Sequence, residues 1–145
     1  MQSVTKQMRT ETGHRLTNYD GRCSHLHGHS YLWEVTAQAA QLTPNGMVMD
    51  FKVLKQAMHQ VLDQFDHAMV LCANDPCSVG LFSMAATNGK PQRVLLLSGN
   101  LTAEYFAQYA AREIQAVLDG MQSKATVTHV RVWETATSYA DWRIE

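Results

Sequence analysis

The most concentrated group of reactive side chains lies in residues 23–31, which read CSHLHGHSY. Three histidines stand there at every second position, and Cys23 precedes them. Residues two apart in a strand project to the same face, so His27 and His29 can converge on one metal ion. Imidazole is a common zinc ligand, and a catalytic zinc takes three protein ligands and leaves a fourth position open. The segment therefore predicts part of a metal site with a thiol close by.

The third ligand must come from another part of the chain, and we select His14, in the sequence TGHRL. His25 stays open as an alternative to His29, because it is also two residues from His27. The glycine between positions 27 and 29 favours His29, as does the expected position of His25 in the preceding loop. A His-x-His pair alone is a weak signal, so surface or hydrogen-bonding histidines are the competing interpretation.

Cys23 lies four residues before His27 and should be near the metal without needing to bind it. A thiol beside a divalent cation and imidazoles becomes a usable thiolate. This makes Cys23 a candidate base or nucleophile. The alternative is that it serves as a fourth zinc ligand and closes a structural site.

Two further groups could carry chemistry. Asp66 is followed by His67, and a carboxylate beside an imidazole can fix the ring's tautomer and raise its basicity. Glu134 extends a strand face that begins with Val130 and Val132 and should be buried. Burial penalises a charge without a partner, so this carboxylate either receives N–H donors from a ligand or lies at an exposed strand end.

The elements that must position these residues follow from the hydrophobic pattern. Period-two alternation predicts a strand from about His27, and helical spacing predicts a helix over 51–65 after an Asp50 cap. A second helix follows Thr102, and Glu104 lies in its first turn, where the helix dipole favours an acid. Further strands are expected at 93–98 and 126–135, whereas the stretch before His14 has few apolar residues. The order of these strands and helices along the chain is not a regular βαβ alternation. It favours an α+β fold with an antiparallel sheet and helices on one side.

Bulk properties exclude several classes of protein. The chain has 145 residues and 46% hydrophobic residues, which is enough for one domain, 1–145, with its own core. A formal net charge of −1 gives no electrostatic footprint for nucleic acid or an anionic membrane. The first residues contain no apolar signal segment, and three cysteines are an odd number. We therefore expect reduced thiols in a cytoplasmic protein.

Six motifs in order along the chain together resemble the 6-pyruvoyltetrahydropterin synthase / 6-carboxytetrahydropterin synthase family. They span nearly the whole chain: GHRL at 13–16, CSHLHGHSY at 23–31, GMVMDFKVLK at 46–55, FDHAMVL at 65–71, LTAEYFAQY at 101–109 and VRVWETATSY at 130–139.

The resemblance implies the tunnelling fold (T-fold), a four-stranded antiparallel sheet with two helices packed on one face. Family members form trimeric barrels, and two trimers usually stack into a hexamer. Their active sites lie between subunits, so the resemblance implies a homo-oligomer, trimer or hexamer, whose isolated chain is inactive.

The resemblance also assigns roles to matching positions. It implies zinc as the metal and 7,8-dihydroneopterin triphosphate as the substrate, with proton transfers leading to loss of triphosphate. The matching residues are His14, His27 and His29 as zinc ligands, Cys23 as the catalytic cysteine, Asp66 with His67 as the proton-transfer pair, Glu134 as the acid that anchors the pterin, and Thr102 and Glu104 as a helix start near the pterin pocket.

Two branches of the family make different products. One makes 6-pyruvoyltetrahydropterin, and the queuosine branch loses acetaldehyde and makes 6-carboxy-5,6,7,8-tetrahydropterin. The compact Cys-x-x-x-His-Gly-His spacing resembles the queuosine form. A non-catalytic, metal-stabilised binding protein of the same fold is the remaining alternative. Residues 72–98 match no family motif, and their role stays open.

Overall fold

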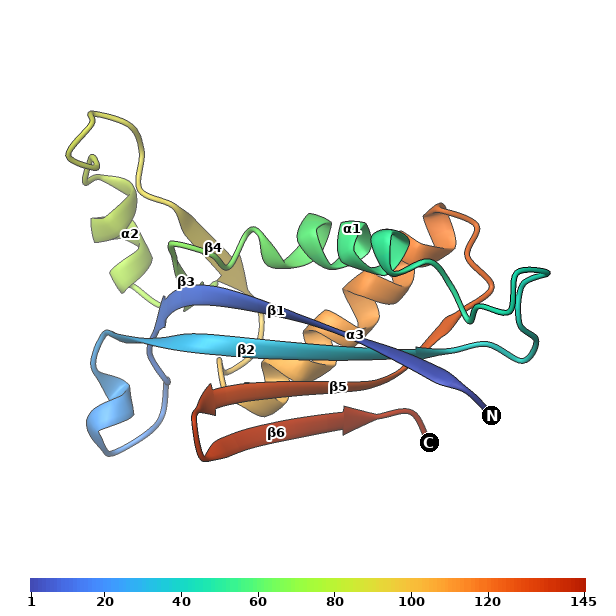
Figure 1. Ribbon diagram of the computed structural model, residues 1–145. Helices are drawn as coiled ribbons and strands as arrows, with labels where there is room; N and C mark the ends of the chain where they lie inside the picture. The colour runs from blue at the N-terminus through green and yellow to red at the C-terminus, as the bar shows by residue number, and fades with distance from the viewer.

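Two long strands form the centre of the protein in the computed structural model, which describes residues 1–145 (Figure 1). β1 (Ser3–His14) and β2 (His27–Gln38) pair antiparallel along their whole length. β5 (Thr126–Thr135) pairs antiparallel with β2, and β6 (Ser138–Arg143) pairs antiparallel with β5. These four strands form an antiparallel sheet of the kind that the family resemblance implies.

The sheet nevertheless has six strands, so the expectation of four is wrong. β3 (Ala68–Cys72) joins the free edge of β1 in parallel, and β4 (Val94–Leu97) joins β3 in parallel. The strand order is β4-β3-β1-β2-β5-β6. β4 lies within the strand expected at 93–98, whereas β3 is not expected, because periodicity alone does not assign such a short apolar run to a sheet. The sheet is therefore mixed, and the α+β class is confirmed.

Both expected long helices are present. α1 (Phe51–Leu62) begins after Asp50, whose side chain accepts a hydrogen bond from the helix's first turn, and α3 (Ala103–Gly120) begins after Thr102 in the same way. α1 ends three residues before the predicted end, in turns that still bury Phe65.

A third helix, α2 (Cys77–Phe82), lies in the segment that matches no family motif. It is six residues long, and Ser78 is its only buried residue, so it adds little to the core. Figure 1 shows it beyond the end of β1, away from the sheet's centre. None of the helices is long and apolar enough to span a membrane.

The core lies between the sheet and the pair α1 and α3, and aromatic rings fill its middle. Tyr31, Trp33, Phe65 and Phe106 are completely buried. The rings of Trp33 and Phe65 are centred 5.0 Å apart, and those of Phe65 and Phe106 5.3 Å apart. Tyr31 and Trp33 lie on the β2 face that also carries His29, so the aromatic core fixes which way the histidines point.

β1 has few apolar residues because its buried face is polar and hydrogen-bonded. Thr10, Thr12 and His14 are buried on the helix side of the sheet. Trp33 Nε1–H donates to Thr10 Oγ1 at 2.8 Å, and the Thr12 hydroxyl donates to the Phe65 carbonyl at 3.0 Å. These bonds satisfy polar groups that burial would otherwise penalise.

Candidate functional site

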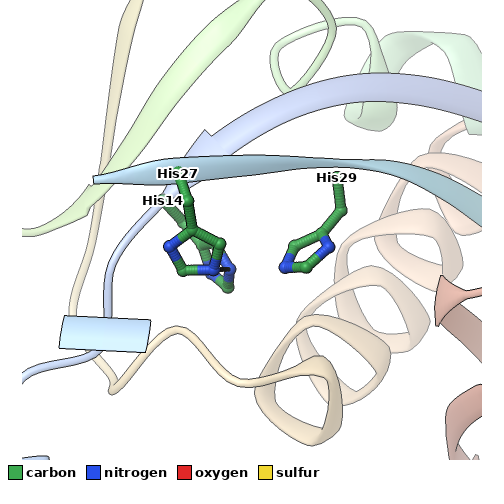
Figure 2. A group of neighbouring side chains, drawn as sticks. All are labelled: His14, His27 and His29. Carbon is green, nitrogen blue, oxygen red and sulfur yellow. Dashed lines mark hydrogen bonds between the residues drawn. The ribbon is translucent and has the colours of Figure 1, made fainter. Parts of the chain in front are cut away.

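Three histidine rings meet where β1 ends and β2 begins. Figure 2 shows His27 and His29 projecting from β2 and His14 from β1, with all three rings on the same side of the strands. One ring nitrogen from each lies within 4.8 Å of the other two. His14 Nε2 and His27 Nε2 are 3.1 Å apart, and His14 is 2% exposed. The structure thus brings together the three residues selected from the sequence.

Backbone carbonyls set the tautomers of two of these rings. His14 Nδ1–H donates to the Leu101 carbonyl at 2.9 Å, and His27 Nδ1–H donates to the His25 carbonyl at 2.7 Å. In the neutral rings, both Nε2 atoms therefore carry lone pairs, and these lone pairs face each other. Two acceptors at this distance repel unless a cation lies between them. Carbonyl hydrogen bonds of this kind orient metal-binding imidazoles in proteins.

His29 supplies a third nitrogen without a hydrogen-bond partner. Its Nε2 is buried and makes no hydrogen bond, and the nearest charged atom is Glu134 Oε1 at 3.5 Å. Burial lowers the pKa of His29 and lowers the pKa of His14 to about 4. Rings that stay neutral at pH 7 can bind a cation directly. Three imidazole nitrogens, one of which has no hydrogen-bond partner, fit a divalent metal of the zinc type.

Cys23 lies beside this cluster in a short 3-10 turn, Arg22–Ser24, and is half-buried. Its sulfur is not among the ligand atoms that gather within 4.8 Å. The structure therefore places the thiol near the histidines without making it a member of the cluster. It lines a cavity of about 320 Å³ together with His14, Leu16, Thr102, Ala103, Glu104, Glu134, Ser138, Tyr139 and Ala140.

Glu134 enters this cavity from a bulge in β5. The pairing between β5 and β6 shifts between Trp133 and Thr135, which leaves Glu134 out of register. The Glu134 side chain is 28% exposed, with Oε1 near His29 Nε2 and Oε2 accepting a 3.5 Å hydrogen bond from the Tyr31 hydroxyl. The carboxylate is thus partly buried and keeps one side open to a ligand.

Tyr31 is a residue of this site that the sequence reasoning missed. It is completely buried, and its hydroxyl lies 3.2 Å from His14 Nε2 as well as beside the Glu134 carboxylate. Burial, followed by the charge of Glu134, raises the pKa of Tyr31, so the hydroxyl keeps its proton. The period-two pattern could have found it, because Tyr31 follows His27 and His29 on the same strand face.

Asp66 and His67 lie elsewhere. Asp66 Oδ1 accepts a hydrogen bond from the Glu11 N–H at 2.9 Å, and Asp66 Oδ2 is 3.0 Å from His67 Nδ1. The hydrogen bond from the Glu11 N–H lowers the pKa of Asp66, and the contact with His67 lowers it further. The His67 ring is 75% exposed and lines a cavity of about 540 Å³. This cavity also contains Glu11, Gly13, Gly28 and Ser30, which alternate with the buried residues of β1 and β2 and face the opposite side of the sheet.

Within one chain, the predicted residues therefore divide between two cavities. Cys23, Thr102, Glu104 and Glu134 share the cavity next to the histidine cluster, which His14 also lines. His67, which Asp66 contacts, lines the other cavity, and His29 also reaches that cavity.

Comparison with protein families gives a match along almost the whole chain. The family model described as 6-pyruvoyl tetrahydropterin synthase matches residues 3–145. Among curated proteins, the 6-carboxy-5,6,7,8-tetrahydropterin synthase of Aquifex aeolicus is 30% identical, with 98% of each chain covered. The protein of the same name from Rickettsia bellii is 32% identical over 97% of this chain and 99% of its own. The protein of the same name from Bacillus subtilis is 28% identical over 97% of this chain and 84% of its own length.

Solved structures show the same fold. An uncharacterised protein from Wolinella succinogenes superposes with a TM-score of 0.82 at 19% identity, covering 99% of this chain and 98% of the other. The 6-pyruvoyl tetrahydropterin synthase of Caenorhabditis elegans superposes with a TM-score of 0.69 at 21% identity, covering 99% and 95%.

Proposed function

Because the chain belongs to the 6-pyruvoyl tetrahydropterin synthase family, we propose that it is a 6-carboxy-5,6,7,8-tetrahydropterin synthase. The proposed reaction converts 7,8-dihydroneopterin triphosphate and one water molecule into 6-carboxytetrahydropterin, acetaldehyde and triphosphate, in queuosine biosynthesis. The curated relatives at 27–32% identity carry this name and support the assignment. The observation that carries the chemistry is that Cys23 shares a cavity with His14, one of the three clustered histidines.

His14, His27 and His29 are the residues that would hold a zinc ion. Bound there, zinc would supply Lewis acidity toward the hydroxyls of the substrate side chain. The Cys23 thiolate accepts a proton from the carbon next to these hydroxyls, because it is the one thiol in this cavity. Glu134 accepts N–H donors of the pterin ring, for which its position at the cavity wall leaves room.

His67, with Asp66 fixing its ring, is the second proton carrier in this proposal. Its cavity lies on the other sheet face from Cys23, so one chain alone cannot deliver both groups to one substrate. We therefore propose a homo-oligomer, trimer or hexamer, in which the His67 of one subunit completes the Cys23 cavity of its neighbour. Free thiols at Cys23, Cys72 and Cys77 support a cytoplasmic location.

A product assay tests the function. The zinc-loaded protein is incubated with 7,8-dihydroneopterin triphosphate, pterins are identified by mass spectrometry, and acetaldehyde is measured separately. We expect 6-carboxytetrahydropterin and acetaldehyde in equal amounts, and neither from a chelator-treated sample. A 6-pyruvoyl product without acetaldehyde would assign the chain to the other branch. If no pterin product formed, the chain would be a metal-stabilised binding protein.

Mixing two inactive variants tests the shared site. C23A and H67A should each have little activity, because each removes one proton carrier. When the two are unfolded and refolded together in equal amounts, random pairing should restore roughly one quarter of the sites. Each variant refolded alone is the control. A mixture no more active than its parents would mean that both groups act within one chain.

A further inference from the structure

The Cys23 thiol is held only through the backbone of its loop. Its sulfur makes no hydrogen bond, and the residue lies in the connection between β1 and β2. One backbone bond, from the Leu16 N–H to the Cys23 carbonyl at 2.8 Å, ties the two sides of this loop together. The position of the thiol relative to the histidines therefore depends on what anchors the loop to the rest of the protein.

Two contacts provide anchors: the Arg15–Asp75 ion pair at the first residue of the loop, and Asn100 further along it. Asn100 Oδ1 accepts hydrogen bonds from the Thr17 N–H at 3.0 Å and the Thr17 hydroxyl at 3.3 Å, and its Nδ2–H donates to the Thr17 carbonyl at 3.2 Å. For residues 17–26, no other hydrogen bond reaches beyond the loop and the strands that it joins. The side chain thus pairs with the loop backbone much as a neighbouring strand would.

The residues after Asn100 serve the same site. The Leu101 carbonyl accepts the Nδ1–H of His14, and the Thr102 side chain caps α3 beside the cavity. Three successive residues therefore contact the thiol loop, a metal-binding ring and the start of α3. A shift at Asn100 would move the thiol loop while Leu101 kept His14 in place.

We propose that Asn100 is a positioning residue that sets the distance between the Cys23 thiol and the histidine cluster. The proposal rests on the proposed function, because it assigns Asn100 a role in the reaction through Cys23. Misplacing a reacting group by about 1 Å can cost on the order of 100-fold in rate. Asn100 is exposed, so replacing it should leave the core intact.

The test compares N100A with T17A. N100A removes all three contacts, whereas T17A removes only the hydroxyl contact and keeps both bonds to the Thr17 backbone. For N100A we expect kcat to fall about 10- to 100-fold, with KM changed less than about twofold and zinc content unchanged. T17A should behave like the wild-type protein. N100D keeps the acceptor and loses the donor, so its kcat should lie between those of N100A and the wild type.

A second measurement does not depend on activity. Iodoacetamide labelling of Cys23 in the zinc-loaded oligomer is followed by peptide mass spectrometry. Freeing the loop should expose the half-buried sulfur, so N100A should be labelled at least about threefold faster than wild type and T17A should not. If the wild type made no product, the proposed function would fail, and labelling would still report on the anchor. Equal labelling rates, an unchanged kcat, or a fall in kcat that matches lost zinc would each overturn the role of Asn100.

Discussion

H27A is expected to lose metal and activity together. His27 supplies one of the two Nε2 atoms that face each other at 3.1 Å, so its removal leaves a site with two nitrogen donors. His27 is only half-buried, unlike His14, so the variant should keep its core. Zinc per subunit should fall from about one to near zero. Elemental analysis measures the metal, and circular dichroism verifies that the variant is folded.

H25A is the matched control for H27A. It removes an imidazole two residues away but keeps the backbone carbonyl that accepts the His27 Nδ1–H. The His25 ring is outside the group of nitrogens that gather within 4.8 Å, so H25A should keep its zinc and its activity. Loss of zinc from H25A and its retention by H27A would show that the cluster has been assigned to the wrong histidines.

C23A is expected to lose turnover while it keeps its metal. The Cys23 sulfur lies outside the histidine cluster but lines the same cavity. If the thiolate is the proton acceptor, kcat should fall by about 10²–10⁴, the usual contribution of a positioned acid or base. Steady-state kinetics and elemental analysis on the same preparation measure both effects.

C77A is the control for this substitution, because Cys77 is also half-buried but lies in α2, outside the cavity. It should retain wild-type kcat and zinc. If C23A lost its zinc, the sulfur would be a fourth ligand of a structural site. If C23A turned over at the wild-type rate, another group would be the base.

Much of the fold follows from local patterns. The caps at Asp50 and Thr102 predict where α1 and α3 begin, because a side chain that accepts from the first turn acts within four residues. The alternation after His27 predicts β2 and its buried face for the same reason. By contrast, β3 is a short apolar run that is not expected as a strand, and its pairing depends on a distant partner, β1. No local pattern distinguishes such a run from a buried loop or helix.

The site divides in the same way. The sequence alone supplies the spacing of His27 and His29 and marks the adjacent Asp66 and His67, and the resemblance to a family gives that pair its role. The Leu101 carbonyl, which sets the tautomer of His14, has no sequence signature because every residue has a carbonyl. The separation of Cys23 from His67 also lies beyond local patterns, since it depends on which sheet face each cavity occupies.

The facing lone pairs of His14 and His27 also affect how long the protein survives in a cell. A cation that binds only the folded chain adds stability that grows with its free concentration. With zinc as the proposed cation, cells depleted of zinc would hold a larger unfolded fraction, which proteases remove. Metal scarcity would then lower the abundance of the enzyme as well as the metal occupancy of its histidine site. Restoring the pterin product would require new synthesis of the chain.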